Sequence, residues 1–364
     1  MNNPLPKEQS LTVLNIAAFV IIIAGVIFAK AIIIPFLLAL FISIISAQPI
    51  YWLESKKVPR GLAVAIMLIG MLALFFGFGY LVGGTISSFT SNASNYEASL
   101  KVINDTFISN LNNYGIKVSE DQFTKMFEPT RILNYTVVAL NGLAKMMGDF
   151  FLTFLIILFM LMEMSSIPDK LRAIFRGPDE ALGYLTKITS SIRHYLAIKT
   201  IIGIVTGVLI YIALTIIGLD YAILWALIAG LMSFIPHIGS IIAAIPALLF
   251  ALVQLGPGGA AWTLAAFMAI NNTIGNFFEP RIMGKGMGLS TLVVFLSLII
   301  WGFILGPVGM FLSVPLTMTI KIMLEQQEDT RWIAILLGSP KDAMVPVVPG
   351  NEKSPVKKVP KQGA

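Results

Sequence analysis

The sequence predicts an all-α polytopic membrane protein, on the strength of its composition and of its successive apolar runs. Of its 364 residues, 57% are hydrophobic and only 12% are charged, and the mean hydropathy is +0.85. Ordinary soluble domains contain about 25% charged residues, and a soluble globule of this composition would have too little polar surface to cover its core. Soluble enzymes and disordered scaffolds are therefore excluded.

The apolar runs predict about eight hydrophobic helical segments, since a spanning helix needs about 20 mostly apolar residues. The first six runs are separated by short polar or basic stretches, apart from longer gaps before the fourth and before the fifth. They are Leu11–Ala29, Ala31–Ile50, Leu62–Val82, Met147–Leu161, Ile201–Leu219 and Ala222–Phe234.

The runs in the C-terminal half are short and interrupted, which predicts broken or re-entrant helices. Gly306-Pro307 is expected to form a tight turn between two helical arms. Backbone that is not helical is tolerated at membrane depth only where protein or a wet cavity surrounds it. The segments concerned are Ile241–Val253, Ala261–Phe278, Leu292–Ile304 and Val308–Met323.

The basic residues predict the orientation. With the N-terminus inside and every run crossing, 19 Lys and Arg residues fall on the inner side and 6 on the outer side. Because inner loops carry the excess of Lys and Arg, both termini are expected in the cytoplasm.

This orientation divides the chain into six parts. Residues 84–146 are expected to form a small external helical segment, and residues 165–200 a cytoplasmic amphipathic helical segment that lies on the inner leaflet or packs under the bundle. The other parts are N-terminal transmembrane helices (1–83), a transmembrane helix (147–164), a C-terminal transport region with broken helices (201–324) and a partly disordered cytoplasmic tail (325–364).

Pro236, His237 and Gly239 mark the first candidate site. Proline removes a backbone donor and glycine permits a bend, so a helix break is expected there. A break frees backbone groups that can bind an ion or a polar solute. The alternative is that His237 is an ordinary interfacial histidine at a helix end.

A polar stripe marks the second candidate site. On a helix, Asn272, Asn276 and Glu279 share one face, and Asn271 and Arg281 lie close by. Because amides exposed to lipid are costly, this face is expected to line a cavity or meet another helix. Glu279 either carries a proton or cation along a pathway or belongs to an interfacial ion pair, and the residues leave both open.

Small residues suggest where helices approach one another. Gly79-x-x-x-Gly83 and Gly203-x-x-x-Gly207 both permit close packing of helices, although the pattern is common.

The sequence lacks the residues that several kinds of functional site require. The chain has no cysteine and two histidines far apart, so no metal site is expected. The segment that ends in Gly284-Lys285-Gly286 begins with Glu279 where a phosphate-binding loop requires glycine. No serine–histidine or paired-carboxylate arrangement appears, and no basic stripe suggests nucleic acid. We therefore expect neither an enzyme nor a cofactor.

The C-terminal half resembles the autoinducer-2 exporter family of membrane transporters, and the resemblance extends over nearly the whole chain. The residues that carry it are Phe234-Ile-Pro-His-Ile-Gly-Ser240, Glu279-Pro-Arg-Ile-Met-Gly284, Gly306-Pro-Val-Gly309 and Ser313-Val-Pro-Leu-Thr317. The resemblance implies export of autoinducer-2, a small polar quorum-sensing signal, from a bacterial inner membrane by an oligomeric protein. Some relatives are instead associated with sodium or lithium/proton antiport.

Three functions are compatible with these patterns. The first is a gradient-driven or facilitative exporter, in which Asn272 and Asn276 bind the solute while the Pro236–Gly239 break and the turn at Gly306, Pro307 and Gly309 act as gates or hinges. The second is a cation/proton antiporter that uses Glu279. The third is a membrane scaffold that transports nothing.

Overall fold

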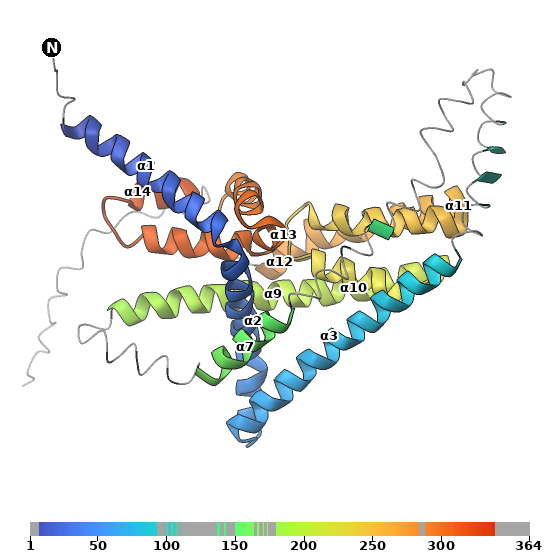
Figure 1. Cartoon of the computed structure of the whole chain (residues 1–364), viewed down its shortest axis with the longest axis horizontal. Coiled ribbons are helices and arrows are strands. Elements are labelled where there is room, and N and C mark those ends of the chain that lie inside the picture. Colours follow the sequence, from blue (N-terminus) through green and yellow to red (C-terminus); the bar gives the residue numbers. More distant parts are fainter. Residues whose placement is uncertain are drawn as a thin grey trace, which may run out of the picture.

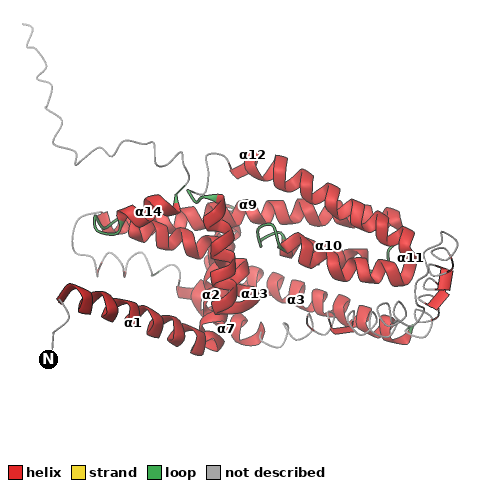
Figure 2. Cartoon of the chain, turned by 90° about the horizontal axis from the view of Figure 1, so that it is seen from above, coloured by secondary structure: helices red, strands yellow, loops and turns green. Residues whose placement is uncertain are grey.

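The computed structural model describes residues 7–92, 150–163, 180–283 and 288–338, together with single positions between 98 and 173. The described residues form α-helices and one π-helical turn, with no strand among them, which confirms the all-α fold class (Figures 1 and 2). The elements are α1 (Lys7–Phe28), α2 (Lys30–Ser55), α3 (Arg60–Ser91), α7 (Phe150–Glu163), α9 (Glu180–Ile217), α10 (Ala222–Met232), α11 (Gly239–Thr273), η1 (Ile274–Phe278), α12 (Glu279–Met283), α13 (Thr291–Leu324) and α14 (Arg331–Leu337).

Five helical stretches are long and apolar enough to cross a membrane. They are Lys30–Ser55, Arg60–Ser91, Thr186–Ile217, Gly239–Phe278 and Thr291–Leu324. In the most apolar part of α3 only 11% of the residues are buried inside the chain. Apolar side chains that a single chain leaves uncovered need lipid or another apolar surface around them, so this exposure fits a membrane protein.

One element differs from the sequence-based expectation. The amphipathic segment and the fifth apolar run were expected to be separate, but α9 continues through both without interruption. No proline occurs between Glu180 and Ile217, and nothing else in this stretch breaks the backbone hydrogen bonding of a helix. Ile192 and Tyr195, in the part of α9 that was predicted to be amphipathic, are buried in the protein. Helix α3 continues to Ser91, inside the predicted external segment of residues 84–146, and most of the rest of that segment lies outside the described residues.

Helix α10 turns back along α9 at very close range. A Cβ on Gly203 would lie 2.7 Å from the carbonyl oxygen of Gly230, and one on Gly207 would lie 3.2 Å from that of Ala226. The Gly203-x-x-x-Gly207 pattern therefore does serve helix packing. Gly83, from the other pattern, has open space around it.

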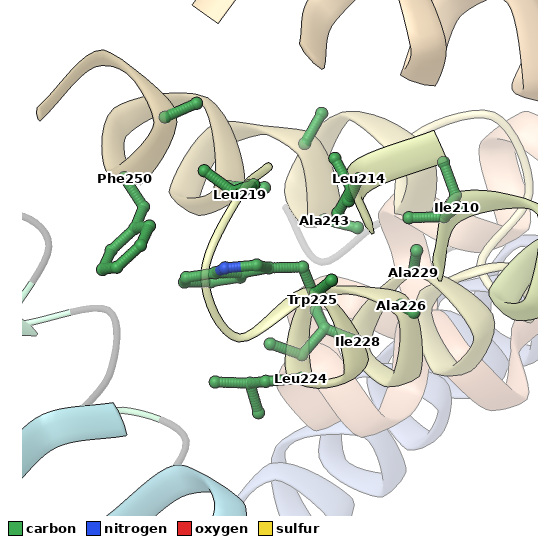
Figure 3. Close-up of a cluster of buried hydrophobic side chains, with 14 of the residues drawn as sticks. Ile210, Leu214, Leu219, Leu224, Trp225, Ala226, Ile228, Ala229, Ala243 and Phe250 are labelled. Atoms are coloured by element: carbon green, nitrogen blue, oxygen red, sulfur yellow. The ribbon is translucent and has the colours of Figure 1, made fainter. Parts of the chain in front are cut away.

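The largest apolar core surrounds Trp225 of α10 (Figure 3). Its indole packs against Phe250 of α11, with ring centroids 5.5 Å apart, and its Nε1 donates a hydrogen bond to the backbone oxygen of Asp220. Gln254 of α11 accepts a hydrogen bond from the Asp220 amide and donates one to the oxygen of Gly218. The α9–α10 turn and the first arm of α11 are thereby fixed to each other.

Helices α11 and α13 are each two arms joined at a glycine. Gly256 (φ 74°) and Gly306 (φ 67°) adopt the left-handed backbone region that favours glycine, and a proline follows each of them. In α13, Trp301 Nε1 of the first arm donates a hydrogen bond to Thr317 Oγ1 of the second. The turn expected at Gly306-Pro307 is therefore present, and Ile241–Val253 forms most of the first arm of α11.

Candidate functional site

The chain between α10 and α11 is a non-helical turn, residues 233–238. His237 has φ 60°, and the Ile238 amide donates a hydrogen bond to the Pro236 oxygen at 2.6 Å. A Cβ at Gly239 would collide with the Met232 carbonyl oxygen, so a glycine is required there. The helix break expected at Pro236–Gly239 is confirmed, and it leaves backbone groups that are not part of a helix.

The second arm of α11 ends in the polar stripe. Asn276 Nδ2 donates a hydrogen bond to Asn272 Oδ1 at 2.7 Å, so the two amides form one unit. The π-helical turn η1 contains Asn276 and leads directly into Glu279, the first residue of α12. Single π-helical turns occur frequently at functional sites, because they rotate the following side chains relative to a regular helix.

Glu279 pairs with a lysine from another helix. Lys199 Nζ of α9 lies 2.5 Å from Glu279 Oε1, and it also donates a hydrogen bond to the Ser233 oxygen at 3.1 Å. The Lys199 side chain is only 1% exposed, whereas 25% of the Glu279 side chain remains exposed. Because a buried ammonium needs a counterion, this contact fixes Lys199, the α10–α11 turn and the start of α12 to one another.

A cavity of about 660 Å³ lies between these elements. Its polar wall contains carboxylate, ammonium, amide, hydroxyl and imidazole groups, and its apolar wall comes from α9, both arms of α11 and the start of α13. The polar residues that line it are Lys199, Thr206, Ser233, His237, Ser240, Asn271, Asn272, Asn276, Glu279 and Thr291.

Most of the residues predicted from the sequence meet at this cavity, and some do not. Asn271, Asn272, Asn276, Glu279, Pro236 and His237 line it. Gly239 is buried beside it, shaping the turn. Arg281 is exposed and does not line it, and the ion pair of Glu279 is with Lys199.

The turn of α13 is separate from the lining of the cavity. Gly306, Pro307 and Gly309 are not among its lining residues. A Cβ on Gly309 would collide with the Trp301 carbonyl oxygen, so this glycine permits the close approach of the two arms.

Sequence reasoning missed Lys199 and Thr206, both on α9. Thr206 is buried, and its hydroxyl has no hydrogen-bond partner within the described part of the chain. A buried hydroxyl without a partner is costly, so it is available to a bound solute or water. The signal that would have found both residues is their spacing of seven on one helix, which places them on the same face.

No group of three or more metal-binding side chains occurs among the described residues. The side chains that line the large cavity offer hydrogen bonding and charge compensation.

Comparison with known proteins identifies the family of this chain. Residues 16–329 match the protein family described as AI-2E family transporters. The chain belongs to this family. It is 40% identical over 326 residues to the AI-2 transport protein TqsA of Escherichia coli (strain K12), which covers 89% of this chain and 94% of that protein.

Two further relatives of this transporter have similar lengths. A putative transport protein of Haemophilus influenzae is 37% identical over 337 residues, covering 91% of this chain and 97% of that protein. The putative transport protein YhhT of E. coli (strain K12) is 32% identical over 339 residues, covering 93% and 97% respectively. The family and the apolar helices together establish a multi-pass membrane transporter.

Proposed function

We propose that this transporter exports a small hydroxylated solute, autoinducer-2 or a molecule of that class, across the bacterial inner membrane through the 660 Å³ cavity. The observation that supports it is the composition of the cavity wall, where paired amides face an apolar surface. Small-molecule sites typically have volumes of about 300–1,000 Å³ and combine apolar walls with a few placed polar groups. The name of the E. coli relative supports the choice of solute.

The side chains divide into those that contact the solute and those that shape the site. Asn272 and Asn276 offer amide donors and acceptors, and Thr206 and Ser240 offer hydroxyls, which match the hydroxyl groups of a polyol. The buried hydroxyl of Thr206 has no partner among the described residues, so an analogue that lacks a matching hydroxyl would leave it unpaired and bind more weakly.

The ion pair between Lys199 and Glu279 is the reason that we favour solute export over cation/proton antiport. A carboxylate that binds a cation must offer its charge to that cation, but Lys199 already neutralises Glu279 at 2.5 Å. We therefore assign Glu279 to holding the α10–α11 turn in place and to orienting the solute. Proton coupling through Glu279 requires that the ion pair open during transport.

In this proposal both termini lie in the cytoplasm. The chain forms a homo-oligomer whose outer surface contacts lipid. The break at Pro236–Gly239 and the turn at Gly306, Pro307 and Gly309 are the proposed moving parts, since they are the points where the helices lose continuity. Transport is gradient-driven or facilitative, and protons or monovalent cations are the candidate coupling ions.

Everted membrane vesicles test this function. Vesicles with the transporter, with Asn276→Leu or with no transporter are loaded with a pH-sensitive dye, and uptake of autoinducer-2 is measured with and without a proton gradient. We expect uptake with the unmodified transporter, weaker uptake with Asn276→Leu and none without the transporter, and a dye response to the solute only if protons drive it. A dye response to sodium or lithium without solute uptake would instead support antiport.

A further inference from the structure

A second, smaller cavity of about 250 Å³ lies against the N-terminal half of α9. It is lined by Lys187, Tyr195 and Ile198 of α9, by Gly288, and by Lys321 and Glu325 at the end of α13. None of these residues belongs to the lining of the 660 Å³ cavity.

The two cavities lie along one face of α9. Lys187 and Ser191 line the small cavity, and Ile202 and Thr206 line the large one, at the helical spacing of three to four residues. Neighbouring residues face different cavities at two places: Ile198 and Lys199 on α9, and Gly288 and Leu289 before α13. These two segments therefore lie between the cavities and contribute to both linings.

The side chains between the two cavities, which we call the partition, are apolar apart from the phenol of Tyr195. Ile198, Ile202 and Leu289 are buried, and they bring no polar group that would bind a solute. Tyr195 is 2% exposed, and its hydroxyl has no hydrogen-bond partner among the described residues. It lies one helical turn before Lys199.

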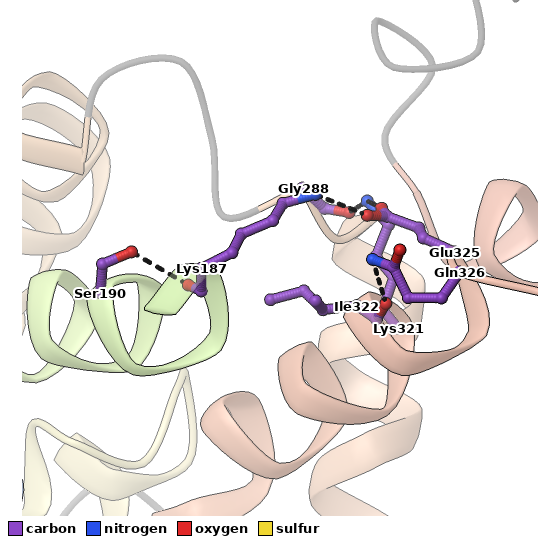
Figure 4. A network of polar contacts seen from close by, with 7 residues as sticks. All are labelled: Lys187, Ser190, Gly288, Lys321, Ile322, Glu325 and Gln326. Atoms are coloured by element: carbon purple, nitrogen blue, oxygen red, sulfur yellow. Dashed lines mark hydrogen bonds and ion pairs between the residues drawn. The ribbon is translucent and has the colours of Figure 1, made fainter. Parts of the chain in front are cut away.

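A network of charges lines the small cavity (Figure 4). Glu325 lies 3.0 Å from Lys187 Nζ and 3.5 Å from Lys321 Nζ, and Lys321 also donates a hydrogen bond to the Gly288 oxygen. Lys321 is only 8% exposed. The network thus connects α9, the end of α13 and the backbone beside Leu289.

We propose that the small cavity is a vestibule on the same transport pathway, and that the Lys187–Glu325–Lys321 network is a latch that keeps Gly288 and Leu289 closed against Tyr195 and Ile198. This rests on the proposed function of the large cavity. When the latch opens, Leu289 moves away from the partition and the solute passes Tyr195, whose hydroxyl then bonds one of the hydroxyl groups of the solute. Glu325 controls the latch because it contacts both lysines.

The absence of cysteine from the chain makes the latch testable by labelling. Thr206→Cys places a thiol in the large cavity, and Ser191→Cys places one in the small cavity. Sealed vesicles of each orientation are treated with a membrane-impermeant maleimide, with Glu325 intact or with Glu325→Gln. Glu328→Gln is the matched control, since it removes an exposed carboxylate three residues away.

We expect the thiol at position 191 to react from the side of the latch in every background. The thiol at position 206 should react from that side at least about fivefold faster with Glu325→Gln than with Glu328→Gln, which corresponds to an ordinary coupling free energy between two sites. Equal rates at position 206 would overturn the latch, and absence of labelling at position 191 from that side would overturn the vestibule. Because no solute is involved, these results stand apart from the identity of the substrate.

Tyr195→Phe tests the role of the hydroxyl. It keeps the ring and removes only the unpaired oxygen, so the folded transporter should elute and melt as before. We expect the apparent affinity for autoinducer-2 during uptake to fall about tenfold, the effect of one lost hydrogen bond. Unchanged affinity with unchanged labelling would remove Tyr195 from the pathway. If the unmodified transporter itself took up no autoinducer-2, that result would contradict the proposed function instead.

Discussion

Lys199 Nζ lies 2.5 Å from Glu279 Oε1, which joins α9 to the start of α12 across 80 residues of sequence. The same ammonium donates a hydrogen bond to the Ser233 oxygen in the turn between α10 and α11. One lysine thus holds together three segments that form the polar wall of the large cavity.

Glu279→Gln should destabilise the transporter, because it leaves the buried Lys199 ammonium without its counterion. Breaking a buried pair costs about 3–5 kcal/mol, and the partial exposure of Glu279 places the expected loss at about 3 kcal/mol. Thermal unfolding in detergent measures the change, with Glu328→Gln as the control for a carboxylate at an exposed position.

The double variant Lys199→Met/Glu279→Gln checks the cause of that loss. Since it removes both charges, it should be more stable than Glu279→Gln alone. If the double variant lost the sum of the two single effects, the two side chains would not act as a pair.

Asn276→Leu should weaken solute binding without unfolding the protein. It removes the Nδ2 donor that contacts Asn272, and with it the amide pair that faces the cavity. We expect about a tenfold rise in the apparent KM for autoinducer-2 uptake. Thr273→Val, on the same helix but outside the cavity lining, is the control and should leave the KM unchanged. A normal KM for Asn276→Leu would show that the amides only pack.

Gly239→Ala should destabilise the turn between α10 and α11, since the added methyl group would collide with the Met232 carbonyl oxygen. The expected loss is about 1–3 kcal/mol, as for other overpacked sites. Gly275→Ala provides the comparison, because a Cβ there has no heavy atom within 4 Å. Equal unfolding temperatures for the two variants would contradict the required close approach.

Gly306→Ala should also be destabilising, for a different reason. Space is open around a Cβ at this position, but the backbone φ of 67° is strained for any residue with a side chain. The expected loss is about 1–2 kcal/mol. Gly70→Ala, inside α3 and likewise uncrowded, should be neutral or slightly stabilising because alanine favours helix. The melting temperatures of the two variants should therefore differ in this direction, and the reverse order would argue against the turn.

Local patterns predicted the parts of this fold that depend on local chemistry. Pro236 and Gly239 predicted the helix break, Gly306-Pro307 predicted the turn, and the spacing of Asn272, Asn276 and Glu279 predicted a shared polar face. Each prediction used only the backbone preference of a residue or the period of a helix.

The partners of these groups depend on tertiary packing and were not predictable. Lys199 was assigned to a cytoplasmic segment because charge asymmetry counts a lysine without reporting its neighbours. Its pairing with Glu279 follows from α9 continuing as one helix and from α11 folding back at Gly256. The π-helical turn at Ile274–Phe278 likewise has no signature in the amino-acid order.

The central claim is that the solute occupies the large cavity, and equilibrium binding of isotope-labelled autoinducer-2 to the purified transporter tests it most directly. Ser240→Trp fills the cavity from its wall, and Thr273→Trp adds the same ring to an exposed neighbouring position outside the lining. We predict that the unmodified transporter and Thr273→Trp bind the solute equally, while Ser240→Trp binds at least about tenfold more weakly. Equal binding by all three proteins would contradict the claim.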